Sequence, residues 1–261
     1  MDNGIYIAAS GSLKQEKMME VVANNLANVN TNGFKKDLMA FEALGADFNE
    51  SKRATPEIPA IPKGHVPPEA LFPTVATVKT DFSPGTLLQT GNAMDIALEG
   101  KGFLEIQTGE GLRYMRSGSF KITDEGQLTT GDGNLVMGKN GPISALPPGQ
   151  SITIDAKGQM TVGNGTANTV VGNLKIVDFP DYGALEKTGV GYYKETGKKS
   201  LVQDAKNVAV LQGALETSNV NIAKEMVSMI EVTRGYETYQ KVIQSIDNLN
   251  NKAVNELSRI T

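Results

Sequence analysis

The spacing of apolar residues predicts two helical ends around a middle of short strands. Residues 5–29 contain no proline, and bulky apolar side chains recur there at intervals of three and four, as on one face of a helix. These side chains are Met19, Val22, Leu26 and Val29. Residues 30–33 favour the left-handed conformation in which helices commonly end. The pattern therefore predicts an N-terminal helix that stops before Gly33.

The C-terminal segment carries a longer apolar repeat. Residues 221–260 lack proline and contain one glycine, Gly235. With Ile222 at heptad position a, the a positions are Ile222, Met229, Tyr236, Ile243, Asn250 and Leu257, and the d positions are Glu225, Val232, Tyr239, Ile246, Ala253 and Ile260. From Met229 onward nine of these ten positions are apolar or aromatic, which is typical of a coiled-coil seam. Asn250, the polar exception, has two interpretations. It is either a non-ideal seam residue near a fraying helix end, or a polar residue that fixes the register of the coiled coil.

Such a seam needs a partner, and the N-terminal stripe is the other helical stripe in the sequence. We therefore expect the two ends to pair. Helices over residues 5–29 and 221–257 are roughly 37 and 55 Å long, so part of the longer one must be covered by other molecules. On the other face of the first helix, Lys17, Glu20, Asn24 and Asn28 are either solvated or hydrogen-bonded across a subunit contact, since asparagine is a poor helix former.

The middle of the chain reads as a strap followed by strands. Residues 55–73 hold six of the eleven prolines, which predicts an extended strap. Beyond it, period-two runs predict strands at 74–80, 95–98, 103–106, 151–154 and 174–177, and turn clusters separate them. Residues 123–129 and 155–161 are similar and predict two related hairpins. This pattern favours an all-β sandwich or an irregular barrel.

The predicted fold is thus α+β, a central all-β domain flanked by terminal helices that pair as a coiled coil. The expected divisions are an N-terminal helix and signature at 1–44, a proline-rich strap at 45–73, a β domain at 74–213 and a C-terminal helix at 214–261.

Composition narrows the possible functions. With 29 acidic against 25 basic residues, the chain lacks the basic field of a nucleic-acid-binding protein. It has no cysteine, which excludes disulfides and thiolate metal sites and suits either a cytosolic protein or one exported unfolded. Neither a signal peptide nor an apolar run of roughly 20 residues is present, so we expect no membrane insertion.

The residues offer no convincing catalytic, cofactor or metal site. His65 is the single histidine and lies in the strap, so it cannot build a catalytic triad or a multi-histidine metal site. The acidic residues Asp124, Glu125, Asp132 and Asp155 fall in turns, where aspartate caps its own backbone, although spacing alone does not exclude a carboxylate pair. We expect Arg113 and Arg116, which flank Tyr114, to be surface charges. The sequence does not predict an enzyme.

Both ends resemble the flagellar rod and hook axial family. Residues 24–36 look like its N-terminal signature, and residues 213–221 with 226–230 look like its C-terminal signature. Residues 95–103, 114–120 and 126–128 resemble motifs of its core domain. Within the family, residues 1–6, 141–144 and 151–154 are more similar to the proximal rod protein, with the distal rod protein as the alternative. A more remote alternative is an extracytoplasmic β-domain binding protein or hydrolase.

The resemblance implies a structural subunit of the periplasmic rod that passes torque from the motor to the hook and filament. It implies that the terminal helices form the inner core of a tube. The implied partners are further copies of the chain, neighbouring rod proteins and the flagellar type III export apparatus. The stripes and signatures together predict an assembly interface at Met19, Val22, Asn24, Asn25, Leu26, Asn28, Val29, Ser218, Asn219, Val220, Asn221, Met229, Val232, Tyr236, Tyr239, Ile243, Ile246, Asn250 and Leu257.

Overall fold

The computed structural model describes residues 2–44, 72–144, 151–163, 168–189, 191–196 and 202–257. His65 and nearly all of the predicted strap at 45–73 lie outside these residues. The chain divides into two compact units, one made of residues 1–26, 37–79 and 222–261, and the other of residues 27–36 and 80–221. The chain therefore passes from one unit to the other four times.

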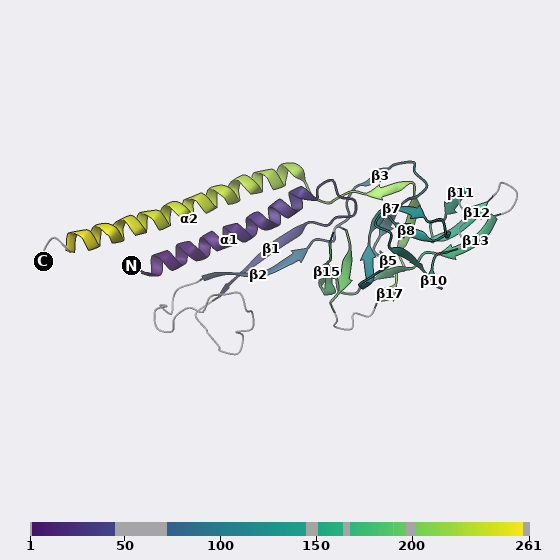
Figure 1. The fold of residues 1–261 in the computed structure, drawn as a ribbon, viewed down its shortest axis with the longest axis horizontal. Helices are drawn as coiled ribbons and strands as arrows, with labels where there is room; N and C mark the ends of the chain where they lie inside the picture. The colour runs from purple at the N-terminus through teal and green to yellow at the C-terminus, as the bar shows by residue number, and fades with distance from the viewer. Residues whose placement is uncertain are drawn as a thin grey trace. The chain divides into compact units, whose positions relative to one another are not determined.

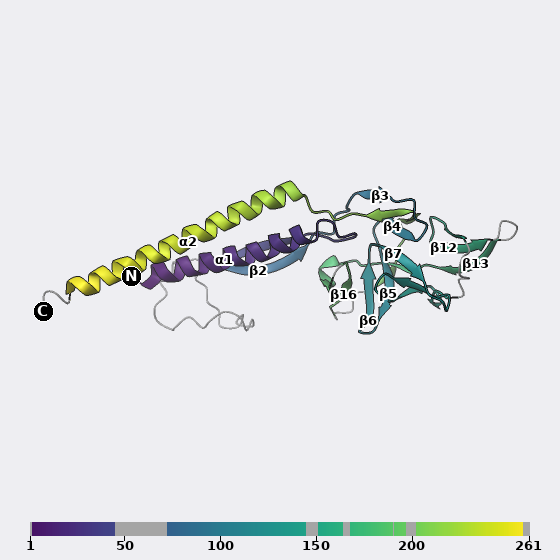
Figure 2. The same cartoon turned by 45° about the horizontal axis from the view of Figure 1, so that its top comes forward.

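The first unit contains two long helices and a two-stranded sheet. Helix α1 spans Asp2–Ala27 and helix α2 spans Ile222–Leu257. They run antiparallel and side by side (Figures 1 and 2). The predicted order of helix, β-rich region and helix is confirmed. Because α1 ends at Ala27, Val29 lies in the turn after the helix and does not extend its stripe.

The two-stranded sheet of the first unit pairs β1 (Asp37–Leu44) with β2 (Phe72–Thr80). The strand predicted at 74–80 forms, and its partner is β1 and not a strand of the second unit. Strand β1 was not predicted, because the residues from Asp37 to Leu44 show no clear alternation of apolar and polar side chains.

The second unit is built from antiparallel strands. Its largest sheet has twelve strands along the path β15-β16-β6-β5-β9-β8-β7-β4-β18, with β10, β14 and β17 joined at the side. These strands are β4 (Asp95–Gly100), β5 (Phe103–Thr108), β6 (Gly111–Met115), β7 (Ser117–Ile122), β8 (Leu128–Thr130), β9 (Leu135–Gly138), β10 (Gly141–Pro142), β14 (Ile176–Asp178), β15 (Leu185–Lys187), β16 (Tyr193–Glu195), β17 (Gln203–Asp204) and β18 (Val208–Gln212).

Two smaller sheets complete this unit. One contains β11 (Ser151–Ile154), β12 (Gln159–Gly163) and β13 (Asn168–Asn173), and the other pairs β3 (Leu87–Gln89) with β19 (Ala214–Glu216). A short 3-10 helix, η2 (Tyr182–Ala184), precedes β15. The strands predicted at 95–98, 103–106 and 151–154 are confirmed as β4, β5 and β11. The strand predicted at 174–177 begins later, as β14.

The core of the second unit has an aliphatic part and an aromatic part. Strand β5 contributes to both, because Leu104 lies in the aliphatic cluster and its neighbour Phe103 in the aromatic one. Phe103 makes edge-on contacts with Phe82, Phe179 and Tyr193, with ring centroids 5.7–5.9 Å apart. Strand β5 is therefore buried on both of its faces.

The two hairpins predicted from the internal similarity are confirmed. In each, a glycine with positive φ donates its N–H to the carbonyl three residues earlier, Gly126 to Thr123 and Gly158 to Asp155. The side chains of Thr123 and Asp155 also accept from the backbone N–H four residues later. The two turns have the same geometry because each has a capping side chain at its start and a glycine at the position that needs the left-handed conformation, which glycine adopts without steric cost.

Candidate functional site

The contacts between α1 and α2 keep one register along most of α1. Each step forward along α1 is matched by an equal step backward along α2. The opposed pairs are Gly4 with Ile246, Gly11 with Tyr239, Gln15 with Gly235, and Asn25 with Glu225. The helices therefore meet along a continuous antiparallel seam.

Three of the α2 residues that contact α1, namely Glu225, Tyr239 and Ile246, are predicted d positions, whereas Gly235 is at a g position. Val232 is buried, and the other described a and d positions from Met229 onward are half-buried, namely Met229, Tyr236, Tyr239, Ile243, Ile246 and Asn250. Leu257 lies in the last turn of the helix. Before Met229, Glu225 is half-buried beside Asn25, while Ile222 is exposed. Packing within one chain therefore covers the heptad stripe only in part.

The seam of α1 differs from the stripe that the sequence predicted. Val22 is buried, while Met19 and Leu26 are only half-buried. The α1 residues whose contacts with α2 define the register are Gly4, Gly11, Gln15 and Asn25, and they include two glycines. Ala8 and Val22, at the same alternate spacing of four and three, are buried. A Cβ atom at Gly11 would lie 2.4 Å from the Tyr239 ring, and one at Gly235 would lie 2.8 Å from the Gln15 amide nitrogen. Glycine at these positions lets the backbones approach large partners.

Asn25 holds the start of β1 against α1. Its Oδ1 accepts from the backbone N–H of Asp37 at 2.8 Å, and its Nδ2 donates to the Asp37 carbonyl at 3.0 Å. The side chain is 2% exposed, and Nδ2 also lies 3.5 Å from the Glu225 carboxylate. A buried amide satisfied on both sides fixes the chain after α1. The neighbouring Asn24 is exposed and Asn28 half-buried.

Asn219 has a related role in the second unit. Its Oδ1 accepts from the backbone N–H of Lys36 at 2.7 Å, and its Nδ2 donates to the carbonyls of Asp81 and Ser83 at 2.9 and 3.1 Å. One amide thus joins three segments that are far apart in the sequence. Around it, Ser218 and Val220 are buried and Asn221 is exposed.

A buried charge cluster lies beside Asn219 in the second unit. The Glu216 carboxylate accepts from Lys35 Nζ at 2.5 Å and from Arg116 Nε at 3.0 Å, and the backbone N–H of Gly85 donates to it at 2.9 Å. The three side chains are at most 7% exposed. Arg116 also donates to the carbonyls of Gly102 and Leu98. Every charge in the cluster therefore has hydrogen-bond partners, as burial requires.

The charged side chains of the cluster shift one another's pKa values. Burial alone raises the pKa of Glu216, but the positive charges of Arg116 and Lys35 and the hydrogen bonds outweigh it and lower that pKa below its ordinary value of 4.5. Burial lowers the pKa of the Lys35 ammonium below 10.5, and Glu216 opposes this shift. A carboxylate stabilised by two cations is the arrangement of a structural ion-pair network.

The prediction that Arg113 and Arg116 are surface charges is wrong. Both side chains are 7% exposed. Arg116 enters the charge cluster, and Arg113 pairs with Glu110 at 3.0 Å. The position of both arginines beside Tyr114 on a short strand was the only signal in the sequence for their burial. The carboxylate partner of Arg116, Glu216, lies 100 residues away in the sequence.

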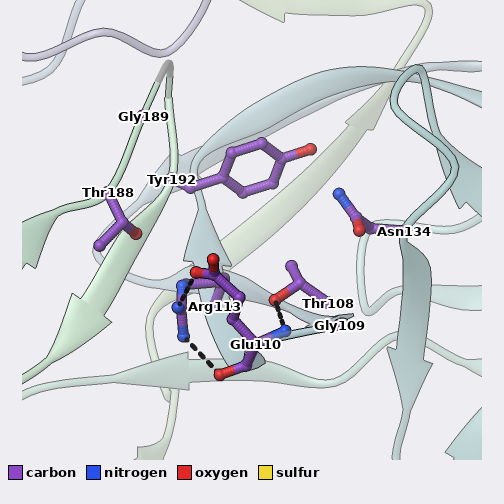
Figure 3. Close-up of a pocket in the computed structure, with 8 residues that line it drawn as sticks. All are labelled: Thr108, Gly109, Glu110, Arg113, Asn134, Thr188, Gly189 and Tyr192. Carbon is purple, nitrogen blue, oxygen red and sulfur yellow. Dashed lines mark hydrogen bonds and ion pairs between the residues drawn. The ribbon is translucent and has the colours of Figure 1, made fainter.

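A cavity of about 450 Å³ opens next to Arg113. Figure 3 shows its lining residues, Thr108, Gly109, Glu110, Arg113, Asn134, Thr188, Gly189 and Tyr192. The Arg113 charge is met by Glu110, and Tyr192 donates to Asp132 at 2.9 Å. Burial raises the pKa of Tyr192, which keeps its hydroxyl protonated. The lining residues thus present neither an activated nucleophile nor a paired acid and base.

The described residues contain no group of three or more histidine, cysteine or acidic side chains placed to hold a metal ion. Within the same part of the chain, neither helix is apolar enough over its length to cross a membrane.

The chain matches three known families along its length. Residues 5–35 match the flagella basal body rod protein family, residues 97–162 the flagellar hook protein FlgE/F/G D1 domain, and residues 211–256 the C-terminal family of flagellar basal body rod FlgEFG proteins. The first and last of these matches contain Asn25, Lys35, Glu216 and Asn219, and the D1 match contains Arg116.

The chain is also similar over its full length to individual flagellar basal-body rod proteins. The chain is 35% identical over 255 residues to the flagellar basal-body rod protein FlgG of Buchnera aphidicola subsp. Baizongia pistaciae, covering 94% of this chain and 96% of the relative. It is 33% identical to FlgF of Escherichia coli strain K12, with 95% of each chain covered. It is 32% identical to FlgF of Caulobacter vibrioides over the full length of both.

Proposed function

Because the chain belongs to the flagellar basal-body rod protein family, we propose that it assembles into the rod through its terminal helices and transmits torque from motor to hook and filament. It is a structural protein and not an enzyme. Its partners are further copies of itself and other rod proteins. It reaches the rod through the flagellar type III export apparatus, and its helix pair is a coiled coil.

The observation that carries this proposal is the continuous seam between α1 and α2. The heptad spacing on both helices and the constant register support a coiled coil, in which side chains at a and d fill the interface. Helix α2 has 36 residues and α1 has 26, so α2 extends beyond its partner. Uncovered helix of this kind supports contacts with other subunits.

Torque must pass through the chain segments that link the helices to the β-rich unit. Asn25 and Asn219 bind the backbone of consecutive residues, Asp37 and Lys36. The buried Lys35–Glu216 pair lies next to them in the sequence. Hydrogen bonds and ion pairs that are buried and fully satisfied resist deformation, because breaking one leaves an unpaired polar group.

Replacement of Ile243 by aspartate tests the proposal. A charge at this a position is unpaired in the seam, so Ile243→Asp should abolish rod assembly and motility. The matched control is Gln244→Asp, which places the same charge on the exposed neighbour and should leave both intact. The measurements are swimming and recovery of the tagged chain in isolated basal bodies. Normal motility of Ile243→Asp cells would contradict the role given to the seam.

Within the rod, we place the chain in the proximal segment, with the distal segment as the alternative. Residues 1–6, 141–144 and 151–154 favour the proximal protein, and relatives named FlgF and FlgG are similar to it at comparable identity. Electron microscopy of basal bodies that carry a tagged copy separates the two. Label along the distal length of the rod would overturn the proximal assignment.

A further inference from the structure

The cavity beside Arg113 is lined by turns that join strands of the largest sheet. Its volume of about 450 Å³ lies within the usual range of small-molecule sites, roughly 300–1,000 Å³. The lining residues come from β6 and from the β5–β6, β8–β9 and β15–β16 connections, which all belong to the second unit. The cavity is therefore a feature of the β-rich unit and involves neither terminal helix.

Arg113 gives the cavity a positive charge whose partner is easily displaced. The Arg113 side chain is 7% exposed, whereas the Glu110 side chain that pairs with it is 86% exposed. Figure 3 shows the Glu110 carboxylate beside the Arg113 guanidinium, among the lining residues. An ion pair with so exposed a side chain adds little stability, so Glu110 can move away at small cost. A ligand carboxylate can then take its place, since a planar guanidinium binds carboxylates at two points.

The wall of the cavity also has hydrogen-bonding capacity that the chain leaves unused. Among the residues that the structure describes, the buried Oγ1 of Thr188 has no hydrogen-bond partner. Asn134 adds an amide group to the lining. Buried polar groups are nearly always paired, so an unpaired hydroxyl in the wall of a cavity indicates a group that a polar ligand can satisfy. The lining is thus suited to a ligand with hydroxyl groups as well as a carboxylate.

Tyr192 gives the cavity an aromatic surface that is held in place. Its hydroxyl donates to Asp132 at 2.9 Å and lies 3.1 Å from Thr130 Oγ1, while the side chain stays half-buried. A ring fixed at its polar end offers its apolar face to the C–H groups of a ligand. The turns beside it are open, because a Cβ atom at Gly109 or Gly189 would meet nothing within 4 Å. A ligand longer than the cavity can therefore extend past these glycines.

We propose that the cavity binds an acidic sugar, with the sugar carboxylate on Arg113 in place of Glu110 and the sugar ring against Tyr192. A simple carboxylate would use Arg113 but leave Tyr192 and Thr188 without a contact. A neutral sugar would use the wall but would not displace Glu110. Glu110 thus acts as an internal competitor that lowers the affinity of the site. The inference goes beyond the proposed rod function and does not depend on it.

Glucuronate is the probe for this site, titrated into the purified full-length chain and followed by the NMR signals of the ligand. Glucose has the same ring without the carboxylate, and acetate has the carboxylate without the ring. Each should bind at least fivefold more weakly than glucuronate. Failure of glucuronate to bind overturns the site. Acetate that binds as tightly as glucuronate overturns the sugar and indicates a carboxylate of another source, such as an acidic peptide. Glucose that binds as tightly overturns the role of Arg113.

Two substitutions should change the affinity for glucuronate in opposite directions. Glu110→Gln removes the competing carboxylate and should tighten binding about two- to fivefold, which is the value of an exposed ion pair. Arg113→Gln should weaken binding at least tenfold. If that variant does not fold, Arg113→Lys replaces it and should weaken binding at least threefold, since lysine lacks the two-point geometry. The matched control is Glu125→Gln, the same change at an exposed residue outside the lining, which should leave the affinity unchanged.

The signs of these changes decide the inference. An affinity that stays the same or falls in Glu110→Gln would show that Glu110 does not compete with the ligand, and it would overturn the proposed mode of binding. An unchanged affinity in both Arg113 variants would have the same consequence. Either result leaves the rod function standing, because that function is tested separately at Ile243 in the helix seam.

Discussion

The side chain of Asn25 hydrogen-bonds both backbone polar groups of Asp37, the first residue of β1. These two hydrogen bonds fix the position of the chain after α1, and the same amide lies 3.5 Å from the Glu225 carboxylate. The asparagine comes from the N-terminal family signature, so the signature has a physical role in the fold of the single chain.

Replacement of Asn25 by alanine should weaken the docking of β1 on α1. The change leaves the Asp37 N–H and carbonyl without their side-chain partner and should cost about 1–3 kcal/mol. Thermal unfolding of the purified chain, followed by its helical circular dichroism, measures this. The control is Glu20→Ala, which removes only the exposed Lys17–Glu20 pair and should cost less than about 1 kcal/mol. Equal effects of the two changes would contradict the role of Asn25.

The two seam glycines should respond differently to alanine. At Gly11 the new methyl group meets the Tyr239 ring, so overpacking of about 1–3 kcal/mol should exceed the gain of about 1 kcal/mol in helix propensity. At Gly235 it meets only the mobile end of Gln15, so the variant should be neutral or more stable. Thermal midpoints of the two variants give the comparison. Tyr239→Leu should rescue Gly11→Ala, and a lack of rescue would mean that the ring is not the obstacle.

The charge cluster should make the stability of the protein sensitive to acid. Because the pKa of Glu216 is lower in the folded state, its stabilisation is complete above the ordinary value of 4.5 and is lost as the pH falls through the lowered pKa. Glu216→Gln should cost about 3–5 kcal/mol at pH 7, since it leaves Lys35 and Arg116 buried without a carboxylate. Urea unfolding at several pH values measures both effects. The wild type and Glu216→Gln should converge in stability below pH 4.5, and a constant difference would argue against the assignment.

The second unit should depend on the residues just before α2. A fragment of residues 80–221 keeps the Arg116–Glu216 pair, whereas a fragment of residues 80–213 leaves the guanidinium buried without a carboxylate and removes β19. The shorter fragment should be less stable by about 3–5 kcal/mol. Denaturant midpoints provide the measurement. Equal midpoints would show that Glu216 does not stabilise this unit.

The sequence predicted the elements whose signal is local and periodic. Helix α2 followed from bulky side chains at a and d, and the twin hairpins followed from matching turn residues. The α1 seam was misread, because Gly4, Ala8 and Gly11 carry no apolar bulk and small residues reveal their packing only when the partner is known. The assembly interface that the sequence predicted stays a prediction.

The charge cluster could not be read from the sequence, because its members are far apart along the chain. Lys35 lies 181 residues from Glu216, and Arg116 lies 100 residues from it. Charged side chains are mostly exposed, so isolated Lys, Arg and Glu residues predict a surface. One weak signal existed, since Glu216 directly follows the apolar pair Ala214 and Leu215 in the C-terminal signature.

The distance between these partners also sets the order in which the chain can fold. Asn25 and Glu225 are separated by 200 residues, and contacts of such high contact order form late. A chain that emerges N-terminus first presents α1 and Lys35 long before their partners exist. The buried lysine can be neutralised once Glu216 has been made, but only a chain that includes α2 can close the seam. Synthesis or transport that stops early therefore yields a product that lacks the paired helices, and the fold itself distinguishes finished subunits from truncated ones.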